Sequence, residues 1–384
     1  MNILGIGLDY LMLKNDKVRG DVRERQLDYA KCLNSFNLVI YSPKNLGLRA
    51  EKWSENLIVF PTNSDNKATF ILGALKISSR ICRKELINAI TTEDPFTTGL
   101  VGYLLKKIFK IPLNVQTHVD FIDNRYWLSI RKINRLFNIL GKFILKRADT
   151  IRVGTNTEKK KIAQLGISEN KIFVIPVNSD LRKFNNINGN QIRERYLDGR
   201  FDRIALFSGR LVAQKDIPTL LKAFQIVLDK RPSTLLLILG KGQQESCLRD
   251  LSRSLRISSN VIFTGSIAHD QIPEYLAAAD IYTISSIFEG TCIAMAEAMA
   301  SGKPVVATRF AGTEDLIINS KNGFIIEQKD YKTFAEKILF LLNNPNIAKD
   351  MGKKGMLRVS DFFENNKNID MVIKLWEQTA KIKL

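Results

Sequence analysis

The sequence predicts an α/β protein with two doubly wound domains, each a parallel sheet covered by helices on both faces. The chain has 384 residues, and 45% of them are hydrophobic, which is enough for two separate cores. Short runs that are apolar throughout alternate with amphipathic stretches over most of the length. Strands without a polar face are typical of parallel sheets that are buried on both sides.

The second half of the chain shows this alternation most clearly. The stretches with helical periodicity are Ile217–Leu228, Gln244–Leu255, Gln271–Ala278 and Ile293–Ala300. The runs that predict strands between them are Arg203–Phe207, Leu235–Leu239, Val261–Phe263, Ile281–Ile284, Val305–Ala307 and Phe324–Ile326. We expect residues 200–363 to form one Rossmann-like domain.

The first half follows the same pattern more loosely, and we expect residues 1–180 to form a second Rossmann-like domain. Helices are predicted at Arg23–Leu33, Thr69–Arg83, Gly99–Phe109 and Lys132–Arg147. The predicted strands are Ile3–Ile6, Leu38–Tyr41, Leu57–Val59, Ala89–Thr92, Leu113–Gln116, Thr150–Val153 and Ile172–Ile175. Two such domains are expected to face a central cleft, with ligands at the carboxyl ends of the strands.

Two further segments complete the predicted architecture. Residues 181–199 are polar and rich in Asn, which favours a linker with a short helix at Gln191–Tyr196. Residues 366–384 carry apolar side chains at helical spacing, among them Met371, Leu375 and Trp376. Because this segment follows the last strand of the second domain, we expect a helix that packs back on the first domain.

Composition excludes several classes of protein. No apolar run reaches the roughly 18–20 residues of a membrane span, and the N-terminus lacks the basic region of a signal peptide. The four cysteines show no metal-binding or disulfide spacing, so reduced thiols in the cytoplasm are expected. The net charge is +19, and most of the excess lies in residues 1–200, where 34 basic face 19 acidic residues. This predicts an anionic partner for the first domain.

The segment from Ser285 to Thr308 carries the strongest chemical signal. A predicted strand ends before it, a loop with Glu289 and Gly290 follows, and a helix begins near Thr291 and contains Glu297. The start of a helix beside a glycine offers free N–H groups to a phosphate. Two carboxylates there are suited to accept hydrogen bonds from sugar or ribose hydroxyls.

A second motif follows the first strand of the second domain. Arg210 ends that strand, and Lys215 precedes the next helix. Two fixed cations at one strand end can neutralise a diphosphate. Two weaker signals follow the next strands: the turn Gly240-Lys241-Gly242, and Gly265 with Ile267 close behind it.

In this order, the motifs resemble the retaining glycosyltransferases of family 4, which share the GT-B fold. Glu289 and Glu297, separated by seven residues, match the family's Glu-x7-Glu signature, and Gly209-Arg210-Leu211 with Lys215 matches its donor-diphosphate motif. The likeness covers the whole second half and, more loosely, the first half. There it rests on Glu93–Gly99 and on Gln116-Thr117-His118.

The resemblance implies a role for each matching residue. Arg210 and Lys215 would bind the donor diphosphate, and Glu297 would accept from the ribose hydroxyls. Glu289 would contact the transferred sugar, and His118 would face that sugar and the acceptor. Three further positions complete the implied donor site, namely the backbone at Cys292 and Ile293 for phosphate and Ile267 near the base.

The resemblance also implies that configuration is retained at the transferred carbon. We expect no cofactor and no metal, because the chain has no Asp-x-Asp motif and two cations are available for the diphosphate. Three places depart from the family pattern: Thr291-Cys292 after the Glu-Gly, a single Gly20 where a Gly-Gly loop is usual, and Asn178-Ser179-Asp180 in place of Asn-Gly-Val-Asp.

Each sharp assignment has a plainer alternative. The alternative for the carboxylates and cations of the second domain is ordinary surface charge. The alternative for His118 is a histidine at a strand end that is hydrogen-bonded and has no part in catalysis. Asp120 suits a structural role as well as a catalytic one. Residues 102–161 hold 14 basic against 4 acidic residues, interleaved with Leu136, Ile139 and Phe143. This segment is either a pair of core-packed helices with a solvated basic face or a surface for anionic lipid.

The leading hypothesis is a glycosyltransferase that moves a sugar from a nucleotide-sugar to a saccharide or lipid-linked saccharide. The expected setting is cell-surface polysaccharide synthesis, in the cytoplasm or peripherally at the inner face of the membrane. The alternatives are a nucleotide-sugar epimerase of the same fold and a non-catalytic basic protein that binds nucleotide or nucleic acid. No nucleic-acid recognition motif accompanies the charge, so no nucleic-acid partner is expected.

Overall fold

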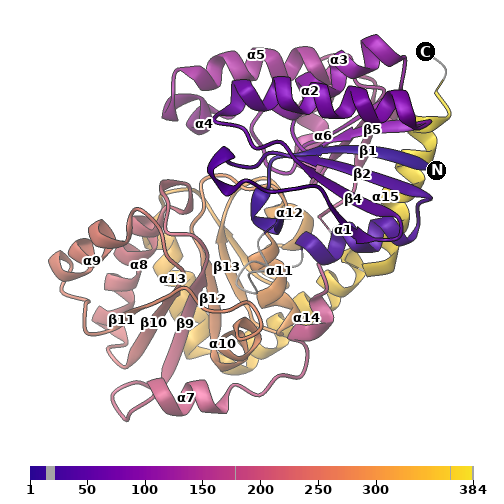
Figure 1. Ribbon diagram of the computed structural model, residues 1–384. Coiled ribbons are helices and arrows are strands. Elements are labelled where there is room, and N and C mark those ends of the chain that lie inside the picture. Colours follow the sequence, from indigo (N-terminus) through magenta and orange to yellow (C-terminus); the bar gives the residue numbers. More distant parts are fainter. Residues whose placement is uncertain (14–21, 178, 364, 383–384) are drawn as a thin grey trace. The chain divides into compact units, whose positions relative to one another are not determined.

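The computed structural model describes residues 1–13, 22–177, 179–363 and 365–382 (Figure 1). The chain divides into two compact units, Met1–Asn178 with Asn365–Leu384 and Ser179–Glu364. Both are α/β, so the predicted fold class of two Rossmann-like domains is confirmed. Gly20 and Asn178, which belong to two of the departures from the family pattern, lie outside the described residues.

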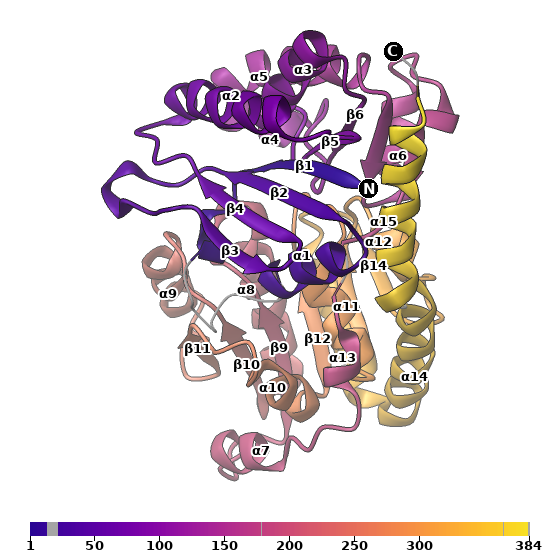
Figure 2. The same cartoon turned by 45° about the vertical axis from the view of Figure 1, so that its right-hand side comes forward.

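Within the described part of the first unit, eight strands form one sheet in the order β3-β4-β2-β1-β5-β6-β7-β8 (Figure 2). All neighbours pair in parallel except β3, which is antiparallel to β4 at the sheet edge. The strand order reverses between β1 and β5, which places a topological switch point there. The strands are β1 (Asn2–Gly7), β2 (Ser35–Ile40), β3 (Glu51–Ser54), β4 (Leu57–Pro61), β5 (Ala89–Thr92), β6 (Leu113–Gln116), β7 (Thr150–Val153) and β8 (Ile172–Val174).

Helices cover both faces of this sheet. Adjacent strand residues point to opposite sides, so Leu4 and Val39 enter one core and Ile3 and Leu38 the other. The first core is closed by α2, α3, α5 and α6, and the second by α1 and α15 (Figure 2). The helices are α1 (Val22–Lys31), α2 (Lys67–Lys84), α3 (Thr97–Phe109), α4 (Arg125–Ile130), α5 (Ile133–Leu145), α6 (Asn156–Ala163) and α15 (Asn365–Ala380).

The C-terminal helix α15 belongs to the first unit. Trp376 is buried in its core and lies edge-on to Tyr29, with ring centroids 5.4 Å apart, and beside Phe36 at 5.7 Å. The Oγ1 atoms of Thr379 and Thr150 lie 2.6 Å apart. The helix therefore joins residues from the two ends of the chain in one core.

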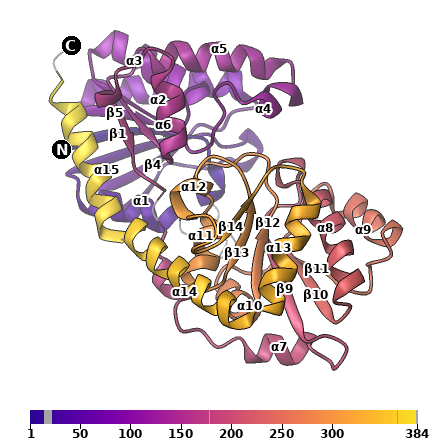
Figure 3. The same ribbon diagram turned by 180° about the vertical axis from the view of Figure 1, so that it is seen from behind.

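The second unit contains a six-stranded parallel sheet among its described residues, in the order β11-β10-β9-β12-β13-β14 (Figure 3). This is the Rossmann order 3-2-1-4-5-6, with its switch point between β9 and β12. The strands are β9 (Arg203–Ser208), β10 (Thr234–Leu239), β11 (Val261–Gly265), β12 (Ile281–Ile284), β13 (Val305–Thr308) and β14 (Phe324–Ile326). The helices are α7 (Asn190–Tyr196), α8 (Ile217–Lys230), α9 (Glu245–Ser254), α10 (Ile272–Ala278), α11 (Ile293–Ala300), α12 (Thr313–Leu316), α13 (Tyr331–Asn343) and α14 (Pro345–Phe362).

The segment 181–199, which the sequence suggested as a linker, belongs instead to the second unit. Leu181 and Phe184 lie on a short 3-10 turn and are buried in that unit's core, as is Ile192 of α7. Arg193 donates to the carbonyl of Ala278 at 2.7 Å. The Asn-rich composition of residues 181–199 indicates the turns in this segment. Its apolar residues Leu181, Phe184 and Ile192 are the part of the sequence that indicates packing in a core.

Candidate functional site

The loops that follow β9 and β12 are joined at the switch point of the second unit. The Ser285 hydroxyl donates to the Lys215 carbonyl at 2.8 Å, and the Ile287 N–H donates to the Gln214 carbonyl at 2.8 Å. The Gln214 amide donates to the Phe288 carbonyl at 2.7 Å. These bonds fix the two loops that carry Lys215 and Glu289 relative to each other.

Lys215 and Glu289 form an ion pair, with Nζ 2.6 Å from Oε1. The two side chains are only 10% and 13% exposed, so solvent screens their attraction weakly. Burial opposes the charge on Lys215, but the Glu289 carboxylate outweighs it and raises the pKa of the ammonium above its usual value. A cation held permanently charged at this strand end is suited to bind an anionic ligand.

Arg210 is exposed on the loop that follows β9. That loop begins at Gly209, whose φ of 153° is poorly accessible to other residues. It packs against the turn after β10, where a side chain on Gly240 would lie 2.0 Å from the Gly209 carbonyl oxygen. The Leu211 N–H donates to the Lys241 carbonyl at 3.0 Å. The Gly-Lys-Gly turn therefore serves to support the Arg210 loop through close backbone packing.

Helix α11 begins directly after the Glu289 loop, at Ile293 with Cys292 as its N-cap residue. Its first N–H groups have no acceptor within the helix, which makes this end attractive to an anion. Burial raises the pKa of the Cys292 thiol to about 12, so the side chain is an uncharged filler. What Cys292 and Ile293 can offer a ligand is therefore their backbone.

Glu297 lies in the second turn of α11 and is contacted by a histidine. His269 Nε2 lies 3.2 Å from Glu297 Oε1, and the Lys183 ammonium lies 3.3 Å from His269 Nδ1. Ile267, two residues before His269, is half-buried against the core in the loop after β11. The sequence indicated Glu297 and Ile267 but gave no role to His269 or Lys183.

His118 follows β6 in the first unit and lines a cavity at the carboxyl ends of β1, β5 and β6. Glu93, Gln116, Arg25 and Arg152 also line it. Burial, reinforced by the two arginines, lowers the pKa of His118 to about 3. The imidazole is therefore neutral near pH 7.

Glu93 is the group in this cavity that titrates near neutral pH. Burial raises the pKa of its carboxyl to about 7, although the Leu8 N–H donates to Oε2 at 2.9 Å and stabilises the charged form. A side chain on Gly7 would lie 2.7 Å from that carboxylate, so the glycine leaves room for it. Arg152 is engaged structurally, since it donates to the carbonyls of Ile175 and Pro176.

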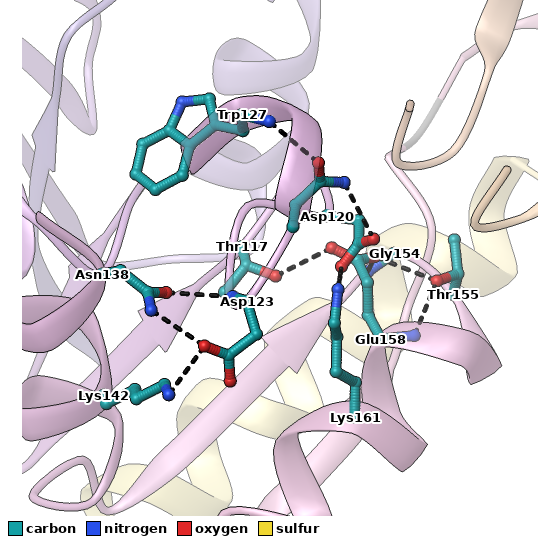
Figure 4. Close-up of polar contacts among 11 residues, drawn as sticks. Thr117, Asp120, Asp123, Trp127, Asn138, Lys142, Gly154, Thr155, Glu158 and Lys161 are labelled. Atoms are coloured by element: carbon teal, nitrogen blue, oxygen red, sulfur yellow. Dashed lines mark hydrogen bonds and ion pairs between the residues drawn. The ribbon is translucent and has the colours of Figure 1, made fainter. Parts of the chain in front are cut away.

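The loop that carries His118 is fixed to α6 by two carboxylates (Figure 4). Glu158 accepts from the Thr117 hydroxyl at 3.1 Å and from the Thr155 hydroxyl at 3.1 Å. Asp120 pairs with Lys161, with Oδ1 2.7 Å from Nζ. Burial and the nearby Asp120 raise the pKa of Glu158 to about 8. Asp120 thus has a structural contact, in line with the plainer of its two readings.

The far end of the same loop is fixed to α5 (Figure 4). The Asn138 side chain accepts from the Asp123 N–H and donates to the Asp123 carboxylate, both at 2.9 Å. Lys142 completes this cluster with Nζ 2.7 Å from Asp123 Oδ1. Because both ends of residues 117–123 are tied to helices, His118 is presented on a rigid support.

Helix α5 also exposes an apolar stripe, defined here as Leu136, Ile139 and Phe143. Their exposed fractions are 62%, 65% and 38%, whereas Ile144, directly after Phe143, is fully buried. Exposed basic residues lie at both ends of this helix, namely Arg131, Lys132, Arg135, Lys146 and Arg147. No helix in the described part of the chain is long and apolar enough to cross a membrane.

The structure brings together several of the residues that the sequence singled out. Lys215 and Glu289 are in direct contact. Arg210 lies close enough for its charge to oppose, in part, the rise that Glu289 causes in the pKa of Lys215. His118 belongs to the first unit and lines the cavity described above. Two cations and a carboxylate therefore lie together at the switch point of the second unit's sheet, where open α/β sheets bind their ligands.

Comparison with known proteins identifies the family. Residues 33–180 match the model "Glycosyltransferase Family 4", and residues 190–358 match "Glycosyl transferases group 1". Together these matches span well over half of the chain. The chain belongs to the glycosyltransferases of family 4, which have the GT-B fold.

Three curated relatives illustrate the sequence likeness. An uncharacterised glycosyltransferase of Haemophilus influenzae is 28% identical over 64% of this chain and 65% of its own length. The putative glycosyltransferase EpsD of Bacillus subtilis is 30% identical over 53% and 54%. An Escherichia coli UDP-Gal:alpha-D-GlcNAc-diphosphoundecaprenol alpha-1,3-galactosyltransferase is 23% identical over 77% of each chain. The chain thus spans less than two thirds of the first two relatives.

Solved structures share the fold over nearly the full length. Sucrose-phosphate synthase from Thermosynechococcus elongatus superposes with a TM-score of 0.81 at 20% identity, covering 98% of this chain and 99% of that one. HepE of Anabaena, solved in complex with UDP, gives 0.78 at 18% identity, with 98% and 100% covered. At such identities the likeness concerns the fold alone.

Proposed function

We propose that the protein is a retaining, metal-independent glycosyltransferase that uses a nucleotide-sugar donor. The observation that carries this proposal is the charged pair of Lys215 and Glu289 at the switch point of the second sheet, with Arg210 beside it. Ligands of open α/β sheets bind at that point, and two cations there match a diphosphate.

The proposed chemistry follows from charge development. When the bond between the sugar and the diphosphate breaks, negative charge grows on the departing phosphate oxygens. Arg210 and Lys215 would stabilise that charge, and preorganised electrostatic groups of this kind supply a large part of enzymatic rate enhancement. The backbone at Cys292 and Ile293 would add phosphate contacts, Ile267 would lie near the base, and Glu297 would accept from the ribose.

Glu289 is proposed to have two functions, contact with the transferred sugar and neutralisation of Lys215 when the donor is absent. Retention of configuration is proposed from family membership. It is tested by nuclear magnetic resonance of the first anomeric product, in which an inverted anomer would contradict it. In the first unit, His118 would act as a neutral hydrogen-bonding group toward sugar or acceptor, because its pKa of about 3 excludes an imidazolium near pH 7.

The acceptor is proposed to be a saccharide or lipid-linked saccharide in cell-surface polysaccharide synthesis. Support comes from the diphosphoundecaprenol-linked substrate named for the Escherichia coli relative. An epimerase of the same fold is the competing function. Consumption of the nucleotide-sugar only when an acceptor is present supports the transferase, whereas conversion of the donor alone supports the epimerase.

The donor site is tested by thermal unfolding with UDP, GDP, ADP and their sugar conjugates. A ligand at 100 times its dissociation constant adds about 2.7 kcal/mol of stability. We expect one base to stabilise the protein, with the same shift in EDTA. Among the described residues, no group of three or more His, Cys, Asp or Glu side chains is arranged to hold a metal, and metal independence remains a prediction until this test. A shift that EDTA abolishes would contradict it.

We further propose that the α5 stripe docks on an anionic membrane surface. Exposed apolar side chains with basic residues at both ends of their helix match the headgroup region of such a membrane in both polarity and charge. The stripe is carried by α5 alone, while Ile144 and Leu145 of that helix stay in the core. The buried face of α5 fits the first alternative from the sequence, a core-packed helix, and the exposed stripe supports the second as a proposal.

Vesicle sedimentation tests the docking. We expect binding to phosphatidylcholine vesicles that contain a quarter phosphatidylglycerol and little binding to pure phosphatidylcholine. Ile139→Asp should reduce binding about tenfold, since it puts a charge among the inserted side chains. Leu357→Asp is the matched control, because Leu357 is equally exposed, at 65%, on α14 of the other unit. Equal loss in both variants, or equal binding to both vesicles, would contradict the proposal.

A further inference from the structure

Lys183, His269 and Glu297 form a chain of contacts within the second unit. The chain runs from the 3-10 turn Leu181–Phe184 through the loop after β11 to helix α11. The His269 ring also lies edge-on to Phe184, with centroids 6.2 Å apart. Three segments that are distant in sequence therefore converge on the Glu297 carboxylate.

The chemistry of the contacts sets the direction of the hydrogen bonds. An ammonium has donors and no acceptor, so the contact of Lys183 with His269 Nδ1 is a hydrogen bond only if Nδ1 is unprotonated. The ring proton then resides on Nε2, which donates to Glu297 Oε1 at 3.2 Å. Lys183 in this way selects the tautomer that lets His269 hold the carboxylate.

Glu297 gains a fixed orientation from this contact. Its side chain is 8% exposed, and its neighbours along α11, Ala296 and Ala298, are fully buried. A glutamate has three side-chain torsions whose freedom is lost when it binds a ligand. With Oε1 already held, a carboxylate still has lone pairs on both oxygens for a pair of hydroxyls. A partner held in advance loses less entropy on binding.

We propose that His269 and Lys183 are positioning residues that hold Glu297 ready for the ribose hydroxyls and so set the preference for ribonucleotide over deoxyribonucleotide donors. This inference rests on the proposed function, in which Glu297 accepts from the ribose. It assigns a role to two residues outside the family motifs. Neither residue needs to touch the nucleotide.

The test compares the affinities of two ligands that differ only in the ribose 2′-hydroxyl. Calorimetry measures the dissociation constants of UDP and 2′-deoxy-UDP for the full-length protein. A hydrogen bond to a charged group predicts that the wild type prefers UDP by about 10- to 100-fold. Glu297→Gln should reduce that ratio and serves as the reference for a weakened ribose contact.

His269→Phe keeps the ring and its contact with Phe184 but removes the Nε2 donor. We expect its UDP preference to fall toward that of Glu297→Gln, while its affinity for 2′-deoxy-UDP changes little. His269→Gln places an amide N–H near the position of Nε2 and should restore the preference. Lys183→Met should reduce the preference for UDP by less than His269→Phe does. Lys230→Met, at the exposed end of α8, is the control.

A purely structural role for His269 would weaken both ligands by the same factor and leave the ratio unchanged. An unchanged ratio in His269→Phe would therefore overturn this inference alone. If the wild type bound none of UDP, GDP or ADP, the proposed donor site would fail, and this inference would fail with it. The two failures are thus distinguished by the wild-type measurement.

Discussion

Lys215 Nζ and Glu289 Oε1 lie 2.6 Å apart, so the cation proposed for the diphosphate is already neutralised by the carboxylate proposed for the sugar. A bound donor must therefore compete with Glu289 for Lys215. Binding of the phosphate and binding of the sugar would therefore be coupled. When the phosphate displaces Glu289 from Lys215, the freed carboxylate becomes available to the sugar hydroxyls.

Glu289→Gln should remove most turnover while UDP binds at least as tightly as to the wild type. The amide cannot neutralise Lys215, so the phosphate meets a cation without a competitor. The variant should also be less stable, by about 3–5 kcal/mol, since removal of one partner leaves a buried charge unpaired. Calorimetry with UDP, urea unfolding and initial rates measure the three effects. Weaker UDP binding in proportion to the lost turnover would contradict this assignment.

Arg210→Ala should weaken UDP binding by about 10- to 100-fold, the range for a charge-assisted hydrogen bond. The affinity for uridine should stay unchanged, because Arg210 is assigned to phosphate only. The loss should shrink at high salt, since the side chain is exposed and its interaction is screened. Calorimetry at 50 mM and 500 mM salt checks this, with Arg256→Ala, on the loop after α9, as control. Equal losses for UDP and uridine would contradict it.

The fold was largely predictable because most strands are short, apolar and isolated by polar turns. The predicted bounds of Ile281–Ile284 and Thr150–Val153 agree with β12 and β7 to the residue. Strand β3 (Glu51–Ser54) was missed because it is a polar edge strand whose side chains are all at least partly exposed. Helix α6 was missed because its sequence, Asn156–Ala163, is mostly polar. Its start is fixed by the N-cap residue Thr155, whose hydroxyl accepts from the Glu158 N–H.

The candidate site was predictable where its residues lie in the loops that follow neighbouring strands. Arg210 and Glu289 each come directly after neighbouring strands of a Rossmann sheet, so the sequence indicates their proximity. The contact of His269 with Glu297 depends on the path of a loop, which periodicity does not encode. Lys183 was hidden because its segment looked like a linker. The pKa shifts of His118 and Glu93 arise from burial in the folded protein, and the sequence carried no signal for them.

The pH dependence of stability should reflect Glu158. Its folded-state pKa of about 8 lies above the ordinary value of 4.5, so folding favours the protonated carboxyl. The stabilisation is complete below about pH 4.5 and is lost as the pH rises toward 8. Thr117 and Thr155 donate to different oxygens of Glu158. In Glu158→Gln the amide oxygen can accept from one hydroxyl and the amide N–H can donate to the other, but the side chain cannot ionise. The variant should therefore show a smaller fall in unfolding free energy between pH 5.5 and 8.5.

Urea unfolding at both pH values measures this fall. Glu93, whose pKa is about 7, contributes with the same sign, so Glu93→Gln and the double variant separate the two groups. Asp120 and Lys161 face Glu158 and form their own ion pair. A fall in Glu158→Gln equal to that of the wild type would show that the carboxyl ionises normally in the folded protein.

Trp376→Ala should destabilise the first unit by about 3–5 kcal/mol, the usual cost of a large aromatic removed from a core. The indole is 1% exposed and fills the space between Tyr29 of α1 and Phe36 of β2. The loss should be confined to that unit, because every one of these contacts lies within it. Hydrogen exchange of the folded variant checks this distribution. We expect faster exchange in β1 and β2 and unchanged protection in β9 and β12. Uniformly faster exchange in both units would instead show that they unfold as one cooperative body, and that α15 stabilises the whole chain.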